Sequence, residues 1–219
     1  KDRYFSSSDS GDFYGKVPIL DLVAGVYTLT VDGYGQTVDD YQFRLLDIAQ
    51  STLLTTGAEV TGQLNPANST NIYQFNAIAG ERYYFDQLNL AGGDVYWRLL
   101  DPYGRDVEGF GLRNFSDDVD TLPLAYTGRY TLLIDGSNYS TTGVSDYRFN
   151  IQKVTDDHLP LTVGAITSGK IDYVGQRDIY TFTLAEAKQL YFDSLTYTYN
   201  INWSLTGPRG EMVNGQFIL

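Results

Sequence analysis

Three carboxylates fall within five residues in the segment Ser116-Asp117-Asp118-Val119-Asp120. Clustered oxygen ligands of this kind suit a hard cation, and Ca²⁺ in particular is held by several carboxylates at once. The segment therefore predicts a calcium site with Asp117, Asp118 and Asp120 as ligands. The alternative interpretation is an acidic loop exposed to solvent. A comparable set of oxygen ligands occurs earlier in the chain, at Asp9, Ser10 and Asp12.

Residues for catalysis are scarce in this chain. It has no cysteine, and its single histidine is His158, which lies in the polar segment Asp156-Asp157-His158-Leu159-Pro160. Nucleophilic catalysis needs a base beside the nucleophile, and zinc sites need histidine or cysteine ligands. Carboxylate pairs could support glycoside hydrolysis, but the acidic residues occur mostly at turns, where aspartate binds local backbone groups. We therefore expect that the chain is not an enzyme. The alternative is a hydrolase whose catalytic carboxylates are not revealed by any motif.

Composition and charge exclude further classes of protein. The net charge of −12 disfavours nucleic acid, because binding phosphates requires clustered lysine and arginine. No apolar run approaches the roughly 18 residues of a membrane-spanning helix. The chain contains 19 tyrosines and 22 glycines, with aromatic residues at 15%. Short aromatic and β-branched runs between glycine, asparagine and aspartate are typical of β-strands.

The chain repeats itself at the length of a domain. The segment Asn71–Phe75 (NIYQF) returns as Asp178–Phe182 (DIYTF), 107 residues later (178 − 71). Each copy is followed by Phe-Asp and by a tryptophan, Trp97 in the first and Trp203 in the second. A repeat of this length predicts similar domains in tandem rather than a solenoid. Because both tryptophans recur at matching positions, we expect them in a core rather than in a ligand site.

A second pair of segments repeats with nearly the same offset. Gly25–Gly33 aligns with Gly128–Gly136 without a gap, and Asp40–Leu45 matches Asp146–Ile151. Apolar and polar residues alternate in these segments, as they do in half-buried strands. Each of the four segments is therefore predicted to form a strand.

The repeats predict one complete unit and two halves. Residues 57–154 form the complete β-sandwich unit, 1–50 the closing half of a preceding unit and 165–219 the opening half of a following one. Each half alone would expose an apolar face and unpaired strand edges. The halves could complement each other within one chain, pair with a domain-swapped copy or be completed by neighbouring repeats. A permuted division, near 1–109 and 110–219, is the alternative.

The order of short motifs resembles the bacterial pre-peptidase C-terminal domain. The matching pieces are Gly62-Gln63-Leu64, Asn71–Phe75, Asp101-Pro102-Tyr103-Gly104, Gly128–Leu132 and Asp146–Phe149. The resemblance covers one full unit and two partial ones. It implies an all-β fold of tandem antiparallel β-sandwich, jelly-roll-like modules, found as non-catalytic appendages of secreted proteases, collagenases and large surface proteins. Some members of that family bind calcium, collagen or polysaccharide.

Repeat and resemblance together predict a non-catalytic module of an exported bacterial protein, located outside the cell or on its surface. The module would act as a spacer or as an interaction module. The alternative is a dedicated collagen-, polysaccharide- or subunit-binding module stabilised by calcium, with exposed tyrosines such as Tyr197 and Tyr199 stacking on the ligand. Function is expected where the copies differ, in the loops Asn65–Thr70, Ser116–Asp120 and Ser137–Ser145.

Overall fold

The structure is a computed structural model that describes residues 19–140 and 143–218. The described part of the chain is built from strands, and its only helical element is one turn of 3₁₀ helix, η1 (Ile48–Gln50). The strands of the sandwich are β1 (Thr52–Leu53), β2 (Val60–Leu64), β3 (Thr70–Ala77), β4 (Arg82–Ala91), β5 (Val95–Leu100), β6 (Leu112–Asn114), β7 (Val119–Pro123), β8 (Gly128–Gly136) and β9 (Ser145–Val154). Four more follow: β10 (Asp157–Pro160), β11 (Asp178–Thr181), β12 (Thr198–Gly207) and β13 (Gly210–Ile218).

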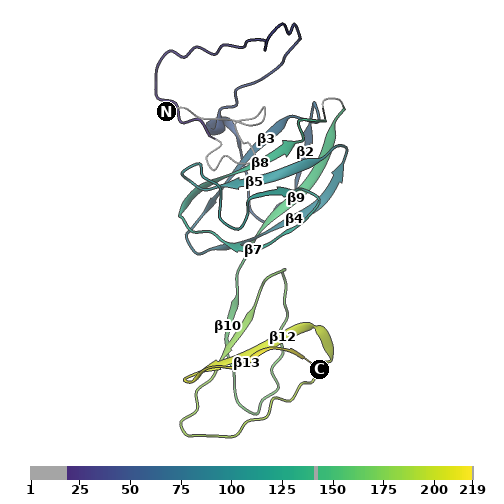
Figure 1. Cartoon of the computed structure of the whole chain (residues 1–219). Helices are drawn as coiled ribbons and strands as arrows, with labels where there is room; N and C mark the ends of the chain where they lie inside the picture. The colour runs from purple at the N-terminus through teal and green to yellow at the C-terminus, as the bar shows by residue number, and fades with distance from the viewer. Residues whose placement is uncertain (1–18, 141–142, 219) are drawn as a thin grey trace. The chain divides into compact units, whose positions relative to one another are not determined.

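Strands β1 to β9 form two sheets that pack face to face (Figure 1). One sheet has the order β1-β3-β8-β5-β6 and the other has the order β2-β9-β4-β7. The pairings are antiparallel except that of β1 with β3. This confirms the all-β, antiparallel sandwich predicted from the sequence. The central strands are β8, between β3 and β5, and β9, between β2 and β4.

An aromatic core lies between the sheets. On β9 every second residue from Ser145 to Ile151 is buried, which is the period that a strand requires. Trp97 on β5 is fully buried, as its recurrence predicts. Its ring lies 4.7 to 6.4 Å from four phenylalanine rings: Phe85, Phe110, Phe115 and Phe149. The core accordingly draws on both sheets and on the loops that connect them.

One polar network crosses the core. The hydroxyl of Tyr147 on β9 lies 2.7 Å from the hydroxyl of Tyr73 on β3, and it accepts a hydrogen bond of 2.7 Å from Asn71 Nδ2. Burial raises the pKa of Tyr147 and of Tyr73, so both hydroxyls stay protonated at neutral pH. The Tyr147 ring occupies the space where Gly62 would carry a Cβ, because that atom would lie 2.3 Å from the Tyr147 hydroxyl oxygen. Glycine at position 62 is therefore required by the tyrosine.

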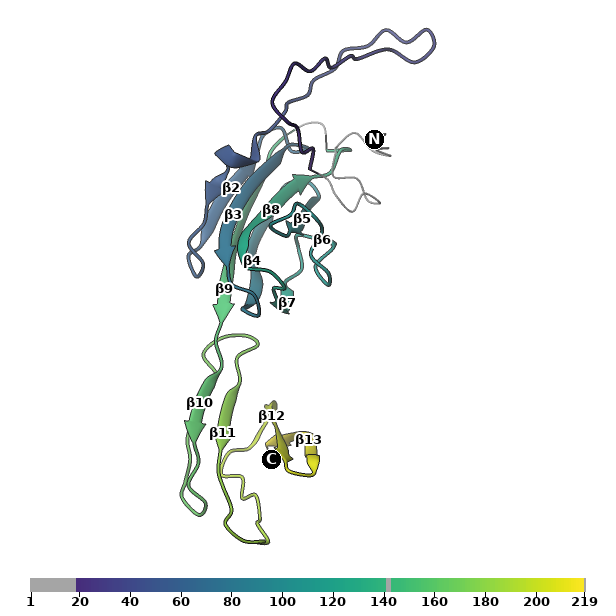
Figure 2. The same ribbon diagram turned by 90° about the vertical axis from the view of Figure 1, so that its left-hand side faces the viewer.

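The sandwich has two ends, which we name by their residues. At the Thr70 end, β3 begins and β8 finishes, with Thr70 paired to Asp135. At the Arg82 end, β4 begins and β9 finishes, with Arg82 paired to Val154. Strand β3 has eight residues, so the two ends lie about 24 Å apart at about 3.4 Å per residue. Figure 2 shows β9 finishing at the Arg82 end, with β10 following it.

The segment before the sandwich contains none of the predicted strands. Residues 19–46 show no strand, although Gly25–Gly33 and Asp40–Leu45 align with β8 and β9. Every residue from Leu20 to Asp47 is exposed. The physical reason follows from the sandwich itself, where β8 and β9 are central strands that hydrogen-bond to neighbours on both sides. A central strand whose neighbours are missing has no partner for its backbone groups.

The chain divides into two compact units. The first extends to Leu159 and includes Ile166–Tyr180, and the second consists of Pro160–Ala165 and the residues from Thr181 onward. Strands β10 and β11 pair with each other, and β12 pairs with β13 as an antiparallel hairpin. No residue from Thr181 to Ile218 is buried, so the described part of the second unit has no core of its own. No helix of the described residues is long and apolar enough to cross a membrane.

Candidate functional site

Two arginines share one aspartate at the Arg82 end of the sandwich. Arg82 Nη1 donates to both carboxylate oxygens of Asp156, at 2.7 and 2.8 Å. Arg177 donates to Asp156 Oδ2 from Nε at 3.0 Å and from Nη2 at 2.5 Å, and its backbone N–H donates to Oδ1 at 3.1 Å. We call these three residues the junction clamp. Arg82 begins strand β4, Asp156 lies in the linker after β9, and Arg177 immediately precedes β11.

A backbone contact continues the junction clamp. Arg82 Nη2 donates to the carbonyl of Gly175 at 2.5 Å. Gly175 has a φ of +78° and lies against Thr121 of β7, so that a Cβ at position 175 would fall 1.7 Å from Thr121 Oγ1. Only glycine fits a left-handed backbone this close to a neighbouring strand. The residues before β11 are thus packed against the sandwich as well as hydrogen-bonded to it.

Burial and charge act in opposite directions on Asp156. Its side chain is 11% exposed, and this burial raises the pKa. The hydrogen bonds from Arg177 and Arg82 outweigh the burial and hold the pKa of Asp156 below its ordinary value of 3.8. The pKa of Asp156 is lower in the folded chain than in the unfolded chain. The junction clamp therefore stabilises the fold above about pH 3.8, and this contribution is lost as the pH falls through the lowered pKa.

The repeat gave no indication of this clamp. The residues at the equivalent positions of Arg82, Asp156 and Arg177 are neutral: Gln189, Gln50 and Thr70. The one available signal was the acidic pair Asp156-Asp157 in the linker, which has no counterpart before the complete unit. The junction clamp lies where the copies differ, but outside the three loops in which function was predicted.

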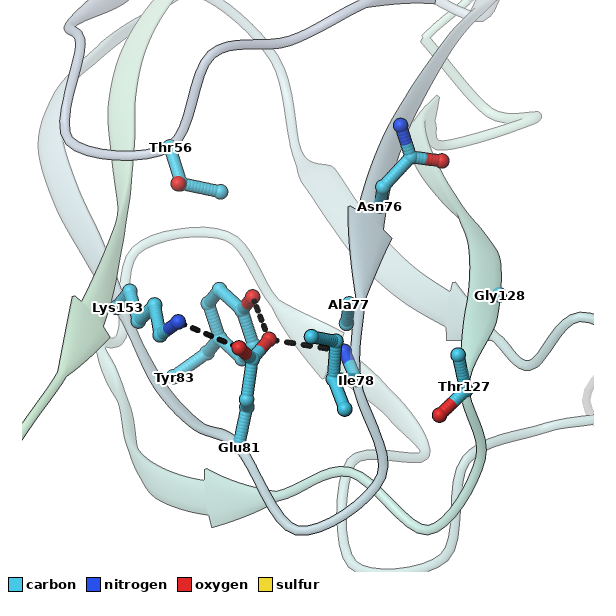
Figure 3. A pocket seen from close by; sticks show the side chains of 9 residues that line it. All are labelled: Thr56, Asn76, Ala77, Ile78, Glu81, Tyr83, Thr127, Gly128 and Lys153. Carbon is cyan, nitrogen blue, oxygen red and sulfur yellow. Dashed lines mark hydrogen bonds and ion pairs between the residues drawn. The ribbon is translucent and has the colours of Figure 1, made fainter.

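A second cluster lies in a pocket at the same end (Figure 3). Glu81 Oε1 accepts from Lys153 Nζ at 2.5 Å, and Oε2 accepts from Tyr83 Oη and from the Ile78 N–H, both at 2.8 Å. The hydrogen bond from Lys153 and that from the Ile78 backbone lower the pKa of Glu81 to about 2. A carboxylate held in this way stays charged at neutral pH and connects β4 to β9. It is poorly suited to proton transfer, which needs a pKa near the working pH.

The substitution Glu81→Gln is expected to destabilise the sandwich by about 1–3 kcal/mol at neutral pH, since it weakens hydrogen bonds to a charged group. Glu81 stabilises the fold above its unfolded pKa of about 4.5, and this contribution is lost as the pH falls toward 2. Urea unfolding at pH values from 7 to 2 should therefore show that the variant and the wild type differ less in their free energy of unfolding as the pH falls. Glu59→Gln is the matched control, because the Glu59–Arg148 pair is half-exposed and such pairs contribute about 0–1 kcal/mol.

His158 lies in β10, so the linker in which it was predicted contains a strand. Its side chain is exposed beside a second pocket, which Arg82 and Asp156 also line. Both oxygens of Asp156 accept hydrogen bonds from the arginines. Asp156 therefore holds the junction together and is not placed to orient the imidazole as a general base.

In the acidic loop, each of the three predicted ligands has its own partner. Asp118 accepts from Tyr84 Oη at 2.5 Å and from the Gln87 N–H at 2.8 Å. Asp120 accepts from the Thr121 N–H at 2.6 Å, and Asp117 from the Ser116 hydroxyl at 3.4 Å. Among the residues that the structure describes, no three acidic or histidine side chains are grouped for a metal ion. The related set Asp9, Ser10 and Asp12 lies outside the described residues.

The calcium site at Asp117, Asp118 and Asp120 stays a prediction, and a melting experiment tests it. Burial and the nearby Asp118 raise the pKa of Asp86, so a cation at this place would relieve repulsion between two carboxylates. Millimolar calcium is expected to raise the melting temperature of the wild-type chain and to leave that of Asp118→Ala unchanged. If calcium does not raise the melting temperature of the wild-type chain, the calcium prediction is wrong.

The tyrosines proposed for stacking on ligands are exposed. Tyr197 and Tyr199 are 73% and 60% exposed, and their rings lie 5.6 Å apart. Their hydroxyls share a hydrogen bond of 2.9 Å. In the loop Ser137–Ser145, Tyr139 is almost fully exposed, while residues 141 and 142 lie outside the described part of the chain.

No protein-family model matches this chain, and no curated protein matches it. Among solved structures it is similar to the pre-peptidase C-terminal domain of a collagenase from Bacillus anthracis, at 18% identity over 47% of this chain and 95% of that one, with a TM-score of 0.33. It is also similar to PliG, a periplasmic inhibitor of g-type lysozyme. For the Salmonella Typhimurium protein the identity is 19%, over 47% of this chain and 97% of that one, with a TM-score of 0.32. For the Aeromonas hydrophila protein the identity is 14%, over 47% of this chain and 96% of that one, with a TM-score of 0.33. Likeness at this level establishes neither a family nor an activity.

Proposed function

We propose that this chain is a non-catalytic spacer built from tandem β-sandwich units, of the kind that its motifs resemble in the pre-peptidase C-terminal domain. Residues 57–154 are the complete unit, and 1–50 and 165–219 are halves of the units before and after it. The spacer belongs to an exported bacterial protein and works outside the cell or on its surface. Its role is to hold neighbouring domains at a defined separation.

The junction clamp is the observation that carries this proposal. A spacer needs the start of each unit to be held in place by the end of the previous one. Arg82 begins β4 at one end of the complete unit, Asp156 lies in the linker that follows β9, and Arg177 immediately precedes β11, a strand of the next repeat. Charge-assisted hydrogen bonds in a fork geometry are both strong and directional. The clamp is therefore suited to fixing a junction rather than to chemistry.

Distance measurements between spin labels test this proposal. The chain has no cysteine, so Asn89→Cys and Val174→Cys place one label on β4 and one just before Gly175. A narrow distance distribution is expected in the otherwise unchanged chain, and a broad one after Arg82→Ala. Glu59→Ala is the matched control, because it removes an exposed ion pair away from the junction clamp and should leave the distribution narrow. A broad distribution with Arg82 present would contradict the proposal.

A binding role is the second candidate, and the exposed tyrosine pair favours it. In the complete unit the position equivalent to Tyr199 is one of two glycines, Gly92 or Gly93, so the core of a repeat does not require an aromatic residue there. Tyr199 contacts the rings of Tyr197 and Phe217 and is still 60% exposed, so its ring is available for stacking on a polysaccharide or on an extracellular protein. Retardation in gels containing polysaccharide should be lost in Tyr199→Ala. Equal migration of the two proteins would exclude this role for Tyr199.

A further inference from the structure

Two exposed tyrosines and one arginine form a cluster beside the start of β8. Tyr103 lies in the turn after β5, and Tyr126 lies in the loop between β7 and β8. Their rings are nearly perpendicular, at 89°, with centroids 5.3 Å apart. The guanidinium carbon of Arg105 lies over both rings, 4.9 Å from the centroid of Tyr103 and 5.2 Å from that of Tyr126. We call these three residues the tyrosine–arginine surface.

The turn that carries Tyr103 is held by a buried aspartate, Asp101. Its Oδ1 accepts from the backbone N–H groups of Tyr103 and Arg105, at 2.8 and 3.0 Å. Its Oδ2 accepts from the Arg105 side chain, from Nε at 2.9 Å and from Nη2 at 2.7 Å. Pro102 lies so close to Gly128, at the start of β8, that a Cβ at position 128 would fall 2.7 Å from the proline ring. The turn and the guanidinium are therefore fixed in place before any ligand binds.

The loop that carries Tyr126 is held by a buried tyrosine, Tyr130. The Tyr130 hydroxyl accepts from the Tyr126 N–H and donates to the Tyr126 carbonyl, both at 3.0 Å. These bonds fix the backbone of Tyr126, while its ring stays 40% exposed and that of Tyr103 stays 64% exposed. Side chains that are already fixed lose little conformational entropy when a ligand binds, and this strengthens binding.

The fold of a repeat does not require the tyrosine–arginine surface. In the opening half, the positions of Tyr103 and Arg105 hold an arginine and a glutamate, Arg209 and Glu211, 106 positions further on. In the closing half, the position of Tyr126 holds a valine, 103 positions earlier. The combination therefore occurs only in the complete unit. Exposed side chains that packing does not demand are candidates for binding.

The chemistry of this surface suits a sugar ring. The face of an aromatic ring carries partial negative charge, so it attracts the C–H groups on one face of a pyranose. A guanidinium has five N–H groups. Asp101 binds the Nε and Nη2 groups of Arg105, whose side chain is half-exposed, so N–H donors remain for sugar hydroxyl groups. A stacking ring and fixed hydrogen-bond donors thus lie side by side.

Charge favours a neutral sugar over an acidic one. Asp101 and Arg105 form an ion pair, so they neutralise each other within the surface. The chain as a whole has a net charge of −12, which repels a polyanion. The tyrosine–arginine surface has no net positive charge of its own to offset that repulsion.

A proline-rich peptide fits the surface less well than a sugar. Such peptides form a polyproline II helix and dock into grooves lined by aromatic rings. In this surface the guanidinium of Arg105 lies over both tyrosine rings. It occupies the corner between them, where a proline ring would have to enter. The ring surface that stays exposed is open and suits stacking.

From these observations we infer that the tyrosine–arginine surface binds a neutral polysaccharide. Tyr103 stacks on a pyranose ring, Arg105 donates to the sugar hydroxyl groups, and Tyr126 keeps the guanidinium in position. The inference goes beyond the spacer role, and it does not use Tyr199, which lies in the other compact unit. Because a polymer can engage two places on one chain, the loss of either reduces the overall avidity.

Electrophoresis in native gels tests the inference on the full chain. The wild type should be retarded by at least one neutral polysaccharide among hydroxyethyl cellulose, soluble starch and galactomannan. Tyr103→Ala should weaken this binding about tenfold, which is the scale of one lost aromatic contact. Arg105→Lys should weaken it as well, because lysine keeps the charge but lacks the planar set of donors.

Tyr139→Ala is the matched control for Tyr103→Ala. Tyr139 is almost fully exposed, but it lies in the loop between β8 and β9, away from Arg105 and its fixed rings. Its removal should leave the retardation unchanged. Urea unfolding should be nearly the same for Tyr103→Ala and the wild type, since the Tyr103 ring is exposed. Weaker retardation of Tyr103→Ala then reports binding rather than folding.

Three results would overturn the inference. One is migration that none of the neutral polysaccharides changes. Another is retardation by alginate or poly-L-proline in their place, which would assign the surface to a polyanion or to a proline-rich protein. The third is retardation that Tyr199→Ala abolishes and Tyr103→Ala leaves unchanged. The spin-label distances across the junction clamp do not involve this surface, so a failure of either test leaves the other conclusion intact.

Discussion

Replacing Trp97 by alanine is expected to destabilise the sandwich by about 3–5 kcal/mol, which is enough to unfold a domain of ordinary stability. Trp97 is fully buried and contacts rings from the opposite sheet and from the connecting loops. Its removal leaves a cavity that the rigid neighbouring rings cannot close. Urea unfolding followed by circular dichroism measures the loss.

Trp203→Ala is the matched control for this substitution. Trp203 occupies the equivalent position in the repeat, but it is only partly buried and stacks on a single ring, that of Phe192. The sandwich should unfold at the same urea concentration as in the wild type. Equal losses from the two substitutions would show that the opening half is part of the same cooperative unit.

Gly62→Ala is expected to have the second largest effect, a destabilisation of about 2–4 kcal/mol. A Cβ at this position would meet three atoms of Tyr147, at 2.3, 2.4 and 2.7 Å. The tyrosine would have to move, and overpacking of this kind costs about 1–3 kcal/mol. The movement would also strain the hydrogen bonds to Asn71 and Tyr73, and the loss of one such bond costs about 1 kcal/mol. Equilibrium unfolding in urea measures the total.

Gly169→Ala is the matched control for Gly62→Ala. Position 169 repeats position 62, but a Cβ there would meet Asp178 Oδ2 and Tyr180 Oη, each at 2.4 Å, rather than a core tyrosine of the sandwich. The substitution should leave the unfolding of the sandwich unchanged. A loss of sandwich stability equal to that of Gly62→Ala would contradict this assignment.

Much of the fold could be predicted because the core repeats. Tyr73, Phe75 and Trp97 recur with fixed offsets, and alternation along Ser145–Val154 shows which residues face inward. Both signals arise from burial, which imposes the same periodicity wherever a unit is built. The β-strands and the core position of Trp97 follow from them directly, whereas the arrangement of the strands as a sandwich was expected from the family resemblance.

Pairing between strands could not be predicted in the same way. The alternation in Gly25–Gly33 predicts a strand, yet the segment forms none, because a central strand depends on partners that sequence alone cannot place beside it. The junction clamp was missed for a different reason. Arg82, Asp156 and Arg177 lie in separate parts of the sequence and have neutral counterparts in the other copies, and only the folded chain brings them together.

Hydrogen exchange tests most directly the claim that residues 57–154 form one complete sandwich and that the segment before it adds no strand. Backbone amides in the strands of residues 60–154 should be protected, because paired and buried strands shield their amides. Amides of 25–31 and 40–45 should exchange freely, since these residues are exposed and form no strand. Protection of 25–31 and 40–45 equal to that of the sandwich strands, or free exchange in the strands of 60–154, would contradict the account.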